Sequence, residues 1–120
     1  MNGLKLVSTG SAMPKGVVTN EDLTKIVDTS DEWITTRTGI HTRRRCGEGE
    51  SHTQLCLAAA RQALERAGIA PEAVGVCLIA TFTGDHLNPA TACILQKELG
   101  FPEDTVCFDL NAACSGFVYA

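Results

Sequence analysis

The sequence has 120 residues, of which 44% are hydrophobic and 20% are charged, and its formal net charge is −4. These values are typical of one globular domain, or part of one, and not of a disordered segment. The acidic balance argues against a nucleic acid or an anionic membrane as the main partner, and no apolar run approaches the roughly 20 residues that a bilayer span requires.

The N-terminal segment predicts a strand followed by a short helix. Residues 3–9 have the composition of a first strand, and glycine and proline predict turns near residues 10–11 and 14–16. Asn20 is expected to cap the short helix, because the two acidic residues after it suit the positive end of a helix dipole.

A second helix is predicted to begin after Ser30. This serine is a good N-cap, acidic residues follow it in the first turn, and Gly39 is a suitable stop. Residues 40–45 are then expected to be extended, and the glycine-containing residues 47–50 predict a flexible loop.

Residues 51–67 give the clearest helical pattern, and Gly68 is expected to end that helix. One face consists almost entirely of small side chains. Such a face has little bulk, so its neighbours in the fold are expected to approach closely. The residues of this face are Cys56, Ala60, Ala63 and Ala67.

Two further strands flank another helix. Residues 74–81 form a continuous apolar run, as expected for a strand that is covered on both faces, and residues 106–110 predict a second buried strand. Between them, Asn88-Pro89 has the pattern of an N-cap followed by proline at the first helical position. That helix is expected to run to about Leu99 and to be closed by the glycine after it.

The alternation of strands and helices predicts an α/β fold with parallel strands and helices on the sheet faces. No internal repeat or low-complexity segment is visible. Residues 115–120 have the pattern of a helix of which only the first turn or two is present.

Cysteine placement predicts reduced thiols rather than a disulfide framework. Several of the six cysteines lie inside apolar strand or helix patterns, where a free thiol behaves as a small hydrophobic group. No C-x-x-C pair is present, and we expect no metal site. Together with residues 1–9, which lack the layout of a signal peptide, this pattern predicts a cytoplasmic protein.

Cys114 is the candidate nucleophile. It follows a predicted buried strand and precedes a predicted helix, whose N-terminus favours a thiolate over a thiol. Cys114 thus lies at the strand end, which is where ligands bind in α/β sheets. The residues next to Cys114 are small, and the Cys114 N–H is suited to form half of an oxyanion hole. The alternative interpretation, which we expect for the other five cysteines, is a thiol that only packs between strand and helix.

Several motifs together resemble beta-ketoacyl-acyl-carrier-protein synthase III, a thiolase-fold condensing enzyme. Their order and spacing are more specific than any one motif, and the D-T-S-D-E-W-I segment is not usual in thiolases or chain-elongating synthases. The motifs are S-T-G-S at residues 8–11, D-T-S-D-E-W-I at 28–34, T-R-T-G-I at 36–40, A-G-I at 67–69 and A-A-C-S-G-F at 112–117.

The resemblance implies a layered thiolase-like fold with a parallel-rich sheet, of which residues 1–120 are the first half of the N-terminal half-domain pair. It also implies that Cys114 accepts an acyl group from acyl-coenzyme A, after which malonyl-acyl-carrier protein loses carbon dioxide and attacks the thioester. The family is homodimeric and requires no cofactor, since coenzyme A thioester is a substrate.

In the family, a His and an Asn from the later half of the protein assist decarboxylation. Both would lie beyond residue 120, so we expect the sequence to be a fragment of a protein of about 320 residues, the family's usual length. By itself, this chain is expected to be inactive in condensation.

The resemblance assigns coenzyme A binding to Trp33 and Arg37, with Thr29 as a further candidate for a hydrogen bond to adenine. Trp33 and Arg37 are four residues apart and therefore share a helix face. An indole offers a flat surface for a base, and a guanidinium offers a planar fork for phosphate. The alternative interpretation is a tryptophan that covers the core beside a cation–π neighbour. The basic residues 43–45 are interpreted as a solvated strand edge rather than a site for phosphate or for an acidic carrier protein.

Asn88 departs from the family pattern, in which an apolar residue is common at this position. The loop of residues 82–89 resembles one that crosses the dimer interface and lines the partner's acyl pocket. Asn88 is therefore either a helix cap or a smaller residue that widens the pocket for a longer primer.

Two other functions remain open. The alternatives to the synthase III interpretation are a related synthase that primes a polyketide or quinolone pathway, and a non-catalytic protein that binds coenzyme A.

Overall fold

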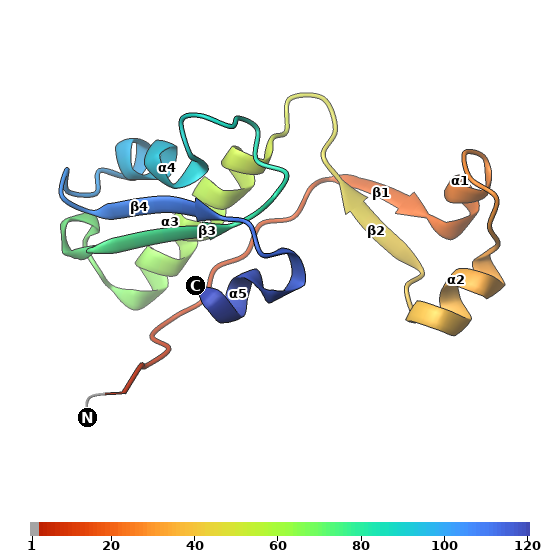
Figure 1. Ribbon diagram of the computed structural model, residues 1–120, viewed down its shortest axis with the longest axis horizontal. Coiled ribbons are helices and arrows are strands. Elements are labelled where there is room, and N and C mark those ends of the chain that lie inside the picture. Colours follow the sequence, from red (N-terminus) through yellow and green to blue (C-terminus); the bar gives the residue numbers. More distant parts are fainter. Residues whose placement is uncertain (1–2) are drawn as a thin grey trace. The chain divides into compact units, whose positions relative to one another are not determined.

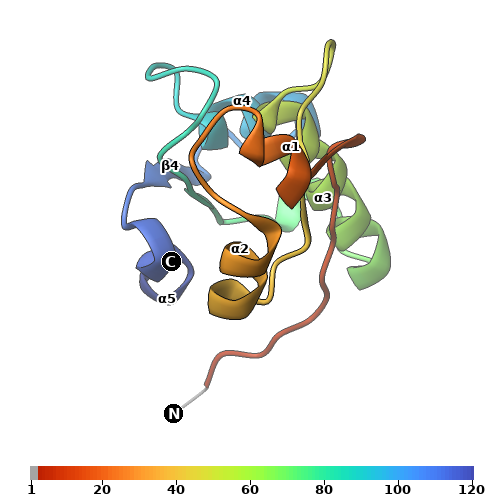
Figure 2. The ribbon, with the colours of Figure 1, turned by 90° about the vertical axis from the view of Figure 1, so that its right-hand side faces the viewer.

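The computed structural model describes residues 3–120, which form two compact units. One unit contains residues 3–12 together with residues 51–120, and the other contains residues 13–50. Figures 1 and 2 show the helices and strands of both units. Cys114 belongs to the first unit, whereas the helix with Trp33 belongs to the second.

The larger unit is built on two parallel strands. Strands β3 (Val76–Ala80) and β4 (Val106–Leu110) pair in parallel, and helix α4 (Thr91–Leu99) lies between them in sequence. This βαβ arrangement confirms the predicted α/β fold with parallel strands. The unit also contains α3 (His52–Ala67), the 3-10 turns η1 (Pro71–Ala73) and η2 (Ala113–Ser115), and the short helix α5 (Gly116–Tyr119).

The two faces of the β3–β4 pair differ in what covers them. One face carries the directly opposed Cys77 and Cys107 and lies against α3 and α4 (Figure 1). On the other face, Val76, Val106 and Phe108 remain 57%, 54% and 46% exposed. The prediction of a strand covered on both faces is therefore wrong for the described residues, in which only α5 begins on the second face.

Helix α3 forms between Ser51 and Gly68, as predicted. The Ser51 hydroxyl accepts a hydrogen bond from Gln54 N–H, and the Gln54 side chain accepts one from Ser51 N–H, both at 3.2 Å. This reciprocal pair satisfies two donors that the first turn leaves free. Gly68 ends the helix with a left-handed φ of 63°, which glycine adopts without steric cost.

Asp85 adds a second, more distant cap to α3. Its carboxylate accepts hydrogen bonds from the backbone N–H groups of Thr53 and His52, at 2.8 and 3.1 Å. Hydrogen bonding to Thr53 is the main cause that lowers the pKa of Asp85 to about 2. These bonds fasten the loop between β3 and α4 to the N-terminus of α3.

Residues 3–9 form no strand, contrary to the sequence-based prediction. No described strand pairs with this segment, so its polar groups bond to α3 instead. Ser8 Oγ donates to the Ala63 carbonyl at 2.7 Å, and the Arg66 guanidinium donates to the Thr9 carbonyl at 3.0 Å.

Gly10 explains how the N-terminal segment fits against α3. A Cβ atom at this position would overlap the Ala59 carbonyl oxygen and lie 2.8 Å from Ala63 N. The backbone therefore approaches the helix more closely than any other residue type would allow. This contact agrees with the close approach that the small side chains of α3 predicted.

Helix α4 begins at Thr91 rather than at Pro89, so the predicted Asn88 cap is wrong. The cap residue is Ala90, whose side chain accepts no hydrogen bond. Asp109 of β4 supplies the acceptor instead, because its carboxylate receives the Thr91 and Ala92 N–H groups at 2.7 and 2.9 Å. A carboxylate from a strand that is distant in sequence thus takes the place of the predicted local N-cap.

The smaller unit is a two-stranded antiparallel sheet with two helices in the connection between its strands. Strand β1 (Gly16–Thr19) pairs with β2 (Thr42–Arg45), which agrees with the extended conformation predicted for residues 40–45. Helices α1 (Asn20–Thr24) and α2 (Asp31–Thr38) lie between the strands in sequence.

The predicted N-cap is wrong for α1 and confirmed for α2. Thr19, not Asn20, caps α1 in a capping box with Asp22, because the Asn20 side chain is buried and bonded elsewhere. Helix α2 begins and ends as predicted: Ser30 Oγ accepts from Trp33 N–H at 3.1 Å, and Gly39 has a φ of 69°.

We predict that Asp109→Ala destabilises the intact protein by about 1 kcal/mol, because it leaves two N–H groups of α4 without their acceptor. Asp109→Asn should cost less, since an amide oxygen still accepts one of these hydrogen bonds. Urea unfolding measures both free energies. Asp104→Ala is the control, because Asp104 is exposed. An equal loss for Asp104→Ala and Asp109→Ala would contradict this role.

Candidate active site

Cys114 lies in a tight turn just beyond the C-terminal end of β4. Strand β4 ends at Leu110, and Cys114 is the central residue of the 3-10 turn η2, which leads into α5. The Ser115 N–H donates to the Ala112 carbonyl at 3.0 Å and closes this turn. The Cys114 side chain is exposed, so its sulfur is not packed away inside the described residues.

Backbone strain is present immediately before the candidate nucleophile. Ala113 has a φ of 45°, a left-handed conformation that is uncommon for a residue with a Cβ atom. Strain of this kind persists only where the surrounding structure imposes it, and it is frequent at functional turns. The strained alanine turns the chain sharply, so that Cys114 follows the strand end without a long connection.

Gly116 allows α5 to begin close to the end of β3. A Cβ atom at Gly116 would lie 2.9 Å from the Ala80 Cβ, which is closer than real side chains approach. The buried Gly116 therefore holds the turn against the carboxyl end of the parallel strands. In α/β folds this end of the sheet is where ligands bind.

Three other thiols of the larger unit, those of Cys56, Cys77 and Cys107, are less exposed than Cys114. Burial is the main cause that raises the pKa values of Cys56, Cys77 and Cys107, and it raises the pKa of Cys77 to about 11. These groups are therefore neutral near pH 7, as expected for thiols that only pack. All six cysteines are free.

Trp33 and Arg37 lie together on α2, as their spacing predicted. The Arg37 Cζ atom is 5.1 Å from the centroid of the Trp33 ring, which is within cation–π distance. The indole is 55% exposed, so it does not cover the core of the described residues. It offers an open flat surface beside a cation.

Two shallow hollows adjoin the Trp33 ring. One has a volume of about 420 Å³ and contains Trp33, Arg37 and Ser30 in its wall, together with Glu32 and Thr36. The other has a volume of about 400 Å³ and brings Thr29 to the same ring. The three residues assigned by resemblance to coenzyme A therefore lie around one surface of the smaller unit.

Asn88 lies in the exposed loop between β3 and α4. The loop also carries Phe82 and Leu87, whose large apolar side chains are exposed. A hollow of about 180 Å³ lies between this loop and the end of β4, lined by residues that include Leu87 and Asn111. Asn88 is not among the residues that line it, and its role in an acyl pocket stays a prediction.

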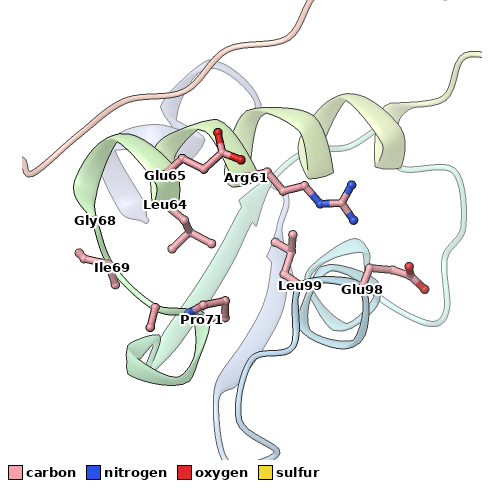
Figure 3. A pocket seen from close by; sticks show the side chains of 9 residues that line it. Arg61, Leu64, Glu65, Gly68, Ile69, Pro71, Glu98 and Leu99 are labelled. Atoms are coloured by element: carbon pink, nitrogen blue, oxygen red, sulfur yellow. The ribbon is translucent and has the colours of Figure 1, made fainter.

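A further cavity of about 430 Å³ lies between the C-terminal ends of α3 and α4 (Figure 3). Leu64, Ile69 and Leu99 provide apolar walls, and the charged Arg61 and Glu98 lie at its edge (Figure 3). It contains none of the predicted site residues. Within residues 3–120 there is no group of three His, Cys, Asp or Glu side chains that could hold a metal ion, and no helix long and apolar enough to cross a bilayer.

The structural roles of three polar residues near these surfaces were not predicted from the sequence. Asp109 and Asp85 cap helices whose first turns are distant in sequence, and Asn20 forms a buried hydrogen-bond cluster. A weak signal exists only for Asp109, a single acidic residue inside an otherwise apolar strand pattern. Such a residue needs a partner, but the sequence does not identify it.

Comparison with known proteins gives consistent similarities, although no protein-family model matches the chain. The chain is 47% identical over 120 residues to the beta-ketoacyl-[acyl-carrier-protein] synthase III of Clostridium acetobutylicum. The alignment covers all of this chain and 36% of that protein. The crystal structure of 3-oxoacyl-[acyl-carrier-protein] synthase III from Aquifex aeolicus has a TM-score of 0.89 at 49% identity, over 98% of this chain and 38% of that one.

A third similarity is to the priming beta-ketosynthase from the R1128 polyketide biosynthetic pathway, with a TM-score of 0.84 at 33% identity, over 98% of this chain and 37% of that one. The chain thus spans 36% to 38% of the length of these three proteins. The structural similarities confirm the predicted thiolase-like α/β fold.

We predict that alkylation of the folded intact protein distinguishes Cys114 from Cys77. With a pKa of about 11, only about 0.1% of Cys77 is thiolate at pH 8, whereas Cys114 and Cys46 are exposed. Brief treatment with iodoacetamide, followed by peptide mass spectrometry, should label Cys114 and Cys46 long before Cys77. Denatured protein, in which all three should react alike, is the control. Equal labelling of Cys77 and Cys114 in the folded protein would contradict the buried environment.

Proposed function

The chain matches the N-terminal part of the beta-ketoacyl-[acyl-carrier-protein] synthase III family along its whole length, and from this premise we propose that the intact protein condenses an acyl-coenzyme A primer with malonyl-acyl-carrier protein. The product is a 3-oxoacyl-carrier protein, which starts fatty acid biosynthesis. The observation that carries this proposal is the exposed Cys114 in a strained turn at the carboxyl end of two parallel strands.

In the first half-reaction, the Cys114 sulfur attacks the thioester carbonyl of acyl-coenzyme A. A new carbon–sulfur bond forms to Cys114, and the bond to the sulfur of coenzyme A breaks, so that coenzyme A leaves as a thiolate. The Cys114 N–H is our candidate for one of the donors that stabilise the oxyanion of the tetrahedral intermediate.

In the second half-reaction, malonyl-acyl-carrier protein loses carbon dioxide, and the electron pair of the broken bond remains on its second carbon. This carbon attacks the acyl-Cys114 carbonyl and forms the new carbon–carbon bond, and the Cys114 thiolate is released. The His and Asn that assist this step in the family come from its later half, so we propose that residues 1–120 alone do not condense substrates.

Coenzyme A is assigned to the surface around Trp33. The exposed indole suits stacking with adenine, Arg37 suits a phosphate, and Thr29 has a hydroxyl for a hydrogen bond to the base. The cation–π contact supports this proposal, because Arg37 Cζ lies 5.1 Å from the centroid of the ring that would bind the base. The thioester is a substrate, and we propose no separate cofactor or metal.

The homodimer and the cytoplasmic location are also proposals. The exposed Phe82 and Leu87 in the loop around Asn88 support an interface there, since large apolar groups of this kind favour burial. Six free cysteines support a reducing compartment.

A second candidate function is the priming of a polyketide pathway. It is favoured by the similarity to the R1128 priming beta-ketosynthase, which has the same fold at 33% identity. In our proposal both functions begin with acylation of Cys114, and they differ in the primer and in the carrier protein. A non-catalytic protein that binds coenzyme A is the third possibility, and acylation distinguishes it.

We predict that radiolabelled acetyl-coenzyme A, or a longer acyl-coenzyme A, transfers its acyl group to Cys114 of the intact protein. Cys114→Ser should abolish stable thioester labelling, because the sulfur that accepts the acyl group is gone. Cys46→Ser is the matched control, since Cys46 is also an exposed thiol, and it should label normally. An intact, folded protein that takes no label from any of these thioesters would favour the non-catalytic alternative.

We predict that Asn88→Phe narrows the acyl pocket, so that the intact enzyme prefers shorter primers. The measurement is kcat/KM for acetyl-, butyryl- and isobutyryl-coenzyme A, and the longer and branched primers should lose about tenfold relative to acetyl. Asn88→Ala removes the amide without adding bulk and should keep the original ranking. An unchanged ranking in Asn88→Phe would count against a pocket role for this position.

A further inference from the structure

Asn20 is the most deeply buried polar side chain of the smaller unit. It is the first residue of α1, directly after β1, and only 1% of its surface is exposed. A buried amide is costly unless its donors and acceptor are paired. Its hydrogen-bond partners therefore indicate what it organises.

The Asn20 amide joins both ends of α2. Its Nδ2 donates to Asp31 Oδ1 at 2.7 Å in the first turn of α2, and to the Ile40 carbonyl at 2.8 Å just after the helix. A longer contact of 3.2 Å reaches Thr35 Oγ1 in the middle of the helix. The Asn20 Oδ1 accepts from the Arg43 guanidinium of β2 at 2.7 Å, so the same side chain also ties the helix to the sheet.

Asp31 and Thr35 lie on the face of α2 opposite to Trp33 and Arg37. At 100° per residue, Asp31 and Thr35 share one side of the helix, and the midpoint of Trp33 and Arg37 is rotated about half a turn away from theirs. The buried Ile34 lies between the two pairs. The hydrogen bonds of Asn20 therefore fix the rotation of the helix that presents the indole and the guanidinium outward.

Apolar packing contributes little to this orientation. Among the described residues of the smaller unit, Ile34 is the one buried apolar side chain. A helix with one buried apolar side chain has few contacts that oppose rotation or sliding. The hydrogen bonds of Asn20 supply the directional restraint that a larger core would otherwise provide.

We propose that Asn20 is a positioning residue for nucleotide recognition. It holds α2 in the setting in which Trp33 and Arg37 receive the adenine and phosphate groups of the acyl-coenzyme A, and it does not touch the substrate. This inference rests on the proposed function, and it adds a residue that controls affinity for the nucleotide end of the substrate but not the chemistry at Cys114.

The test is Asn20→Asp in the intact protein, which keeps the shape of the side chain but replaces the donor that faces Asp31 and Ile40 with an acceptor. We expect KM for acyl-coenzyme A to rise about tenfold or more, because a small misplacement of binding groups has a large effect. The kcat, and the KM for an acyl-pantetheine thioester that lacks the nucleotide, should stay unchanged. A merely structural role would lower kcat or the amount of folded enzyme, with no distinction between the two thioesters.

Two further variants complete the experiment. Asn20→Asp combined with Asp31→Asn exchanges the amide and the carboxylate, restores a donor–acceptor pair, and should recover part of the lost affinity. Asp22→Asn is the matched control, since Asp22 helps to cap α1 and has no hydrogen bond to α2, and its KM should equal that of the wild type.

Trp33→Ala distinguishes a failure of the positioning role of Asn20 from a failure of the assignment of coenzyme A to the Trp33 surface. If Trp33→Ala raises KM for acyl-coenzyme A and Asn20→Asp does not, Asn20 is not a positioning residue. If Trp33→Ala itself leaves that KM unchanged, the assignment of coenzyme A to this surface is wrong.

Discussion

The carboxylate of Asp109 connects the last strand to the helix that precedes it, and the arrangement of the larger unit depends on this connection. The first turn of any helix has N–H groups without partners, and α4 has no local side chain to accept them. Asp109 accepts two of them from within β4. Strand β4 is thereby held in place at Asp109, four residues before the η2 turn that contains Cys114. The position of the candidate nucleophile therefore depends on the start of a helix that is distant in sequence.

The sequence predicted those elements whose signals are local. Ser51 and Gly68 bound α3, and Ser30 and Gly39 bound α2, because a cap and a left-handed stop act within one turn of the helix. The parallel βαβ unit followed from the alternation of apolar strands with a helix. The wrong predictions of caps and strand pairing concerned Asn88-Pro89, Asn20 and residues 3–9, where the true partners are distant in sequence. The caps and pairings of these segments are decided by Asp109, by a buried cluster and by the surface of α3.

The same distinction applies to the candidate sites. The spacing of Trp33 and Arg37 placed them on one helix face, and the turn after β4 placed Cys114 at a strand end, since both depend on local geometry. The strain at Ala113 and the burial of Asn20 had no signal in the sequence. Both units are poor in buried apolar side chains, with Ala92 and Leu95 in one and Ile34 in the other among the described residues. The hydrogen bonds of three polar side chains therefore do much of the work of positioning helices α2, α3 and α4. These side chains are Asn20, Asp85 and Asp109.

The bare face of the β3–β4 pair has a consequence for handling the segment in isolation. A two-stranded sheet has two open edges, and here it also has a patch of Val76, Val106 and Phe108 in contact with water. Such a surface is a template for the addition of further strands or of a second copy. Residues 3–120 produced alone would accordingly self-associate or bind chaperones during synthesis, and they would remain dispersed only when another layer of protein lies over that patch.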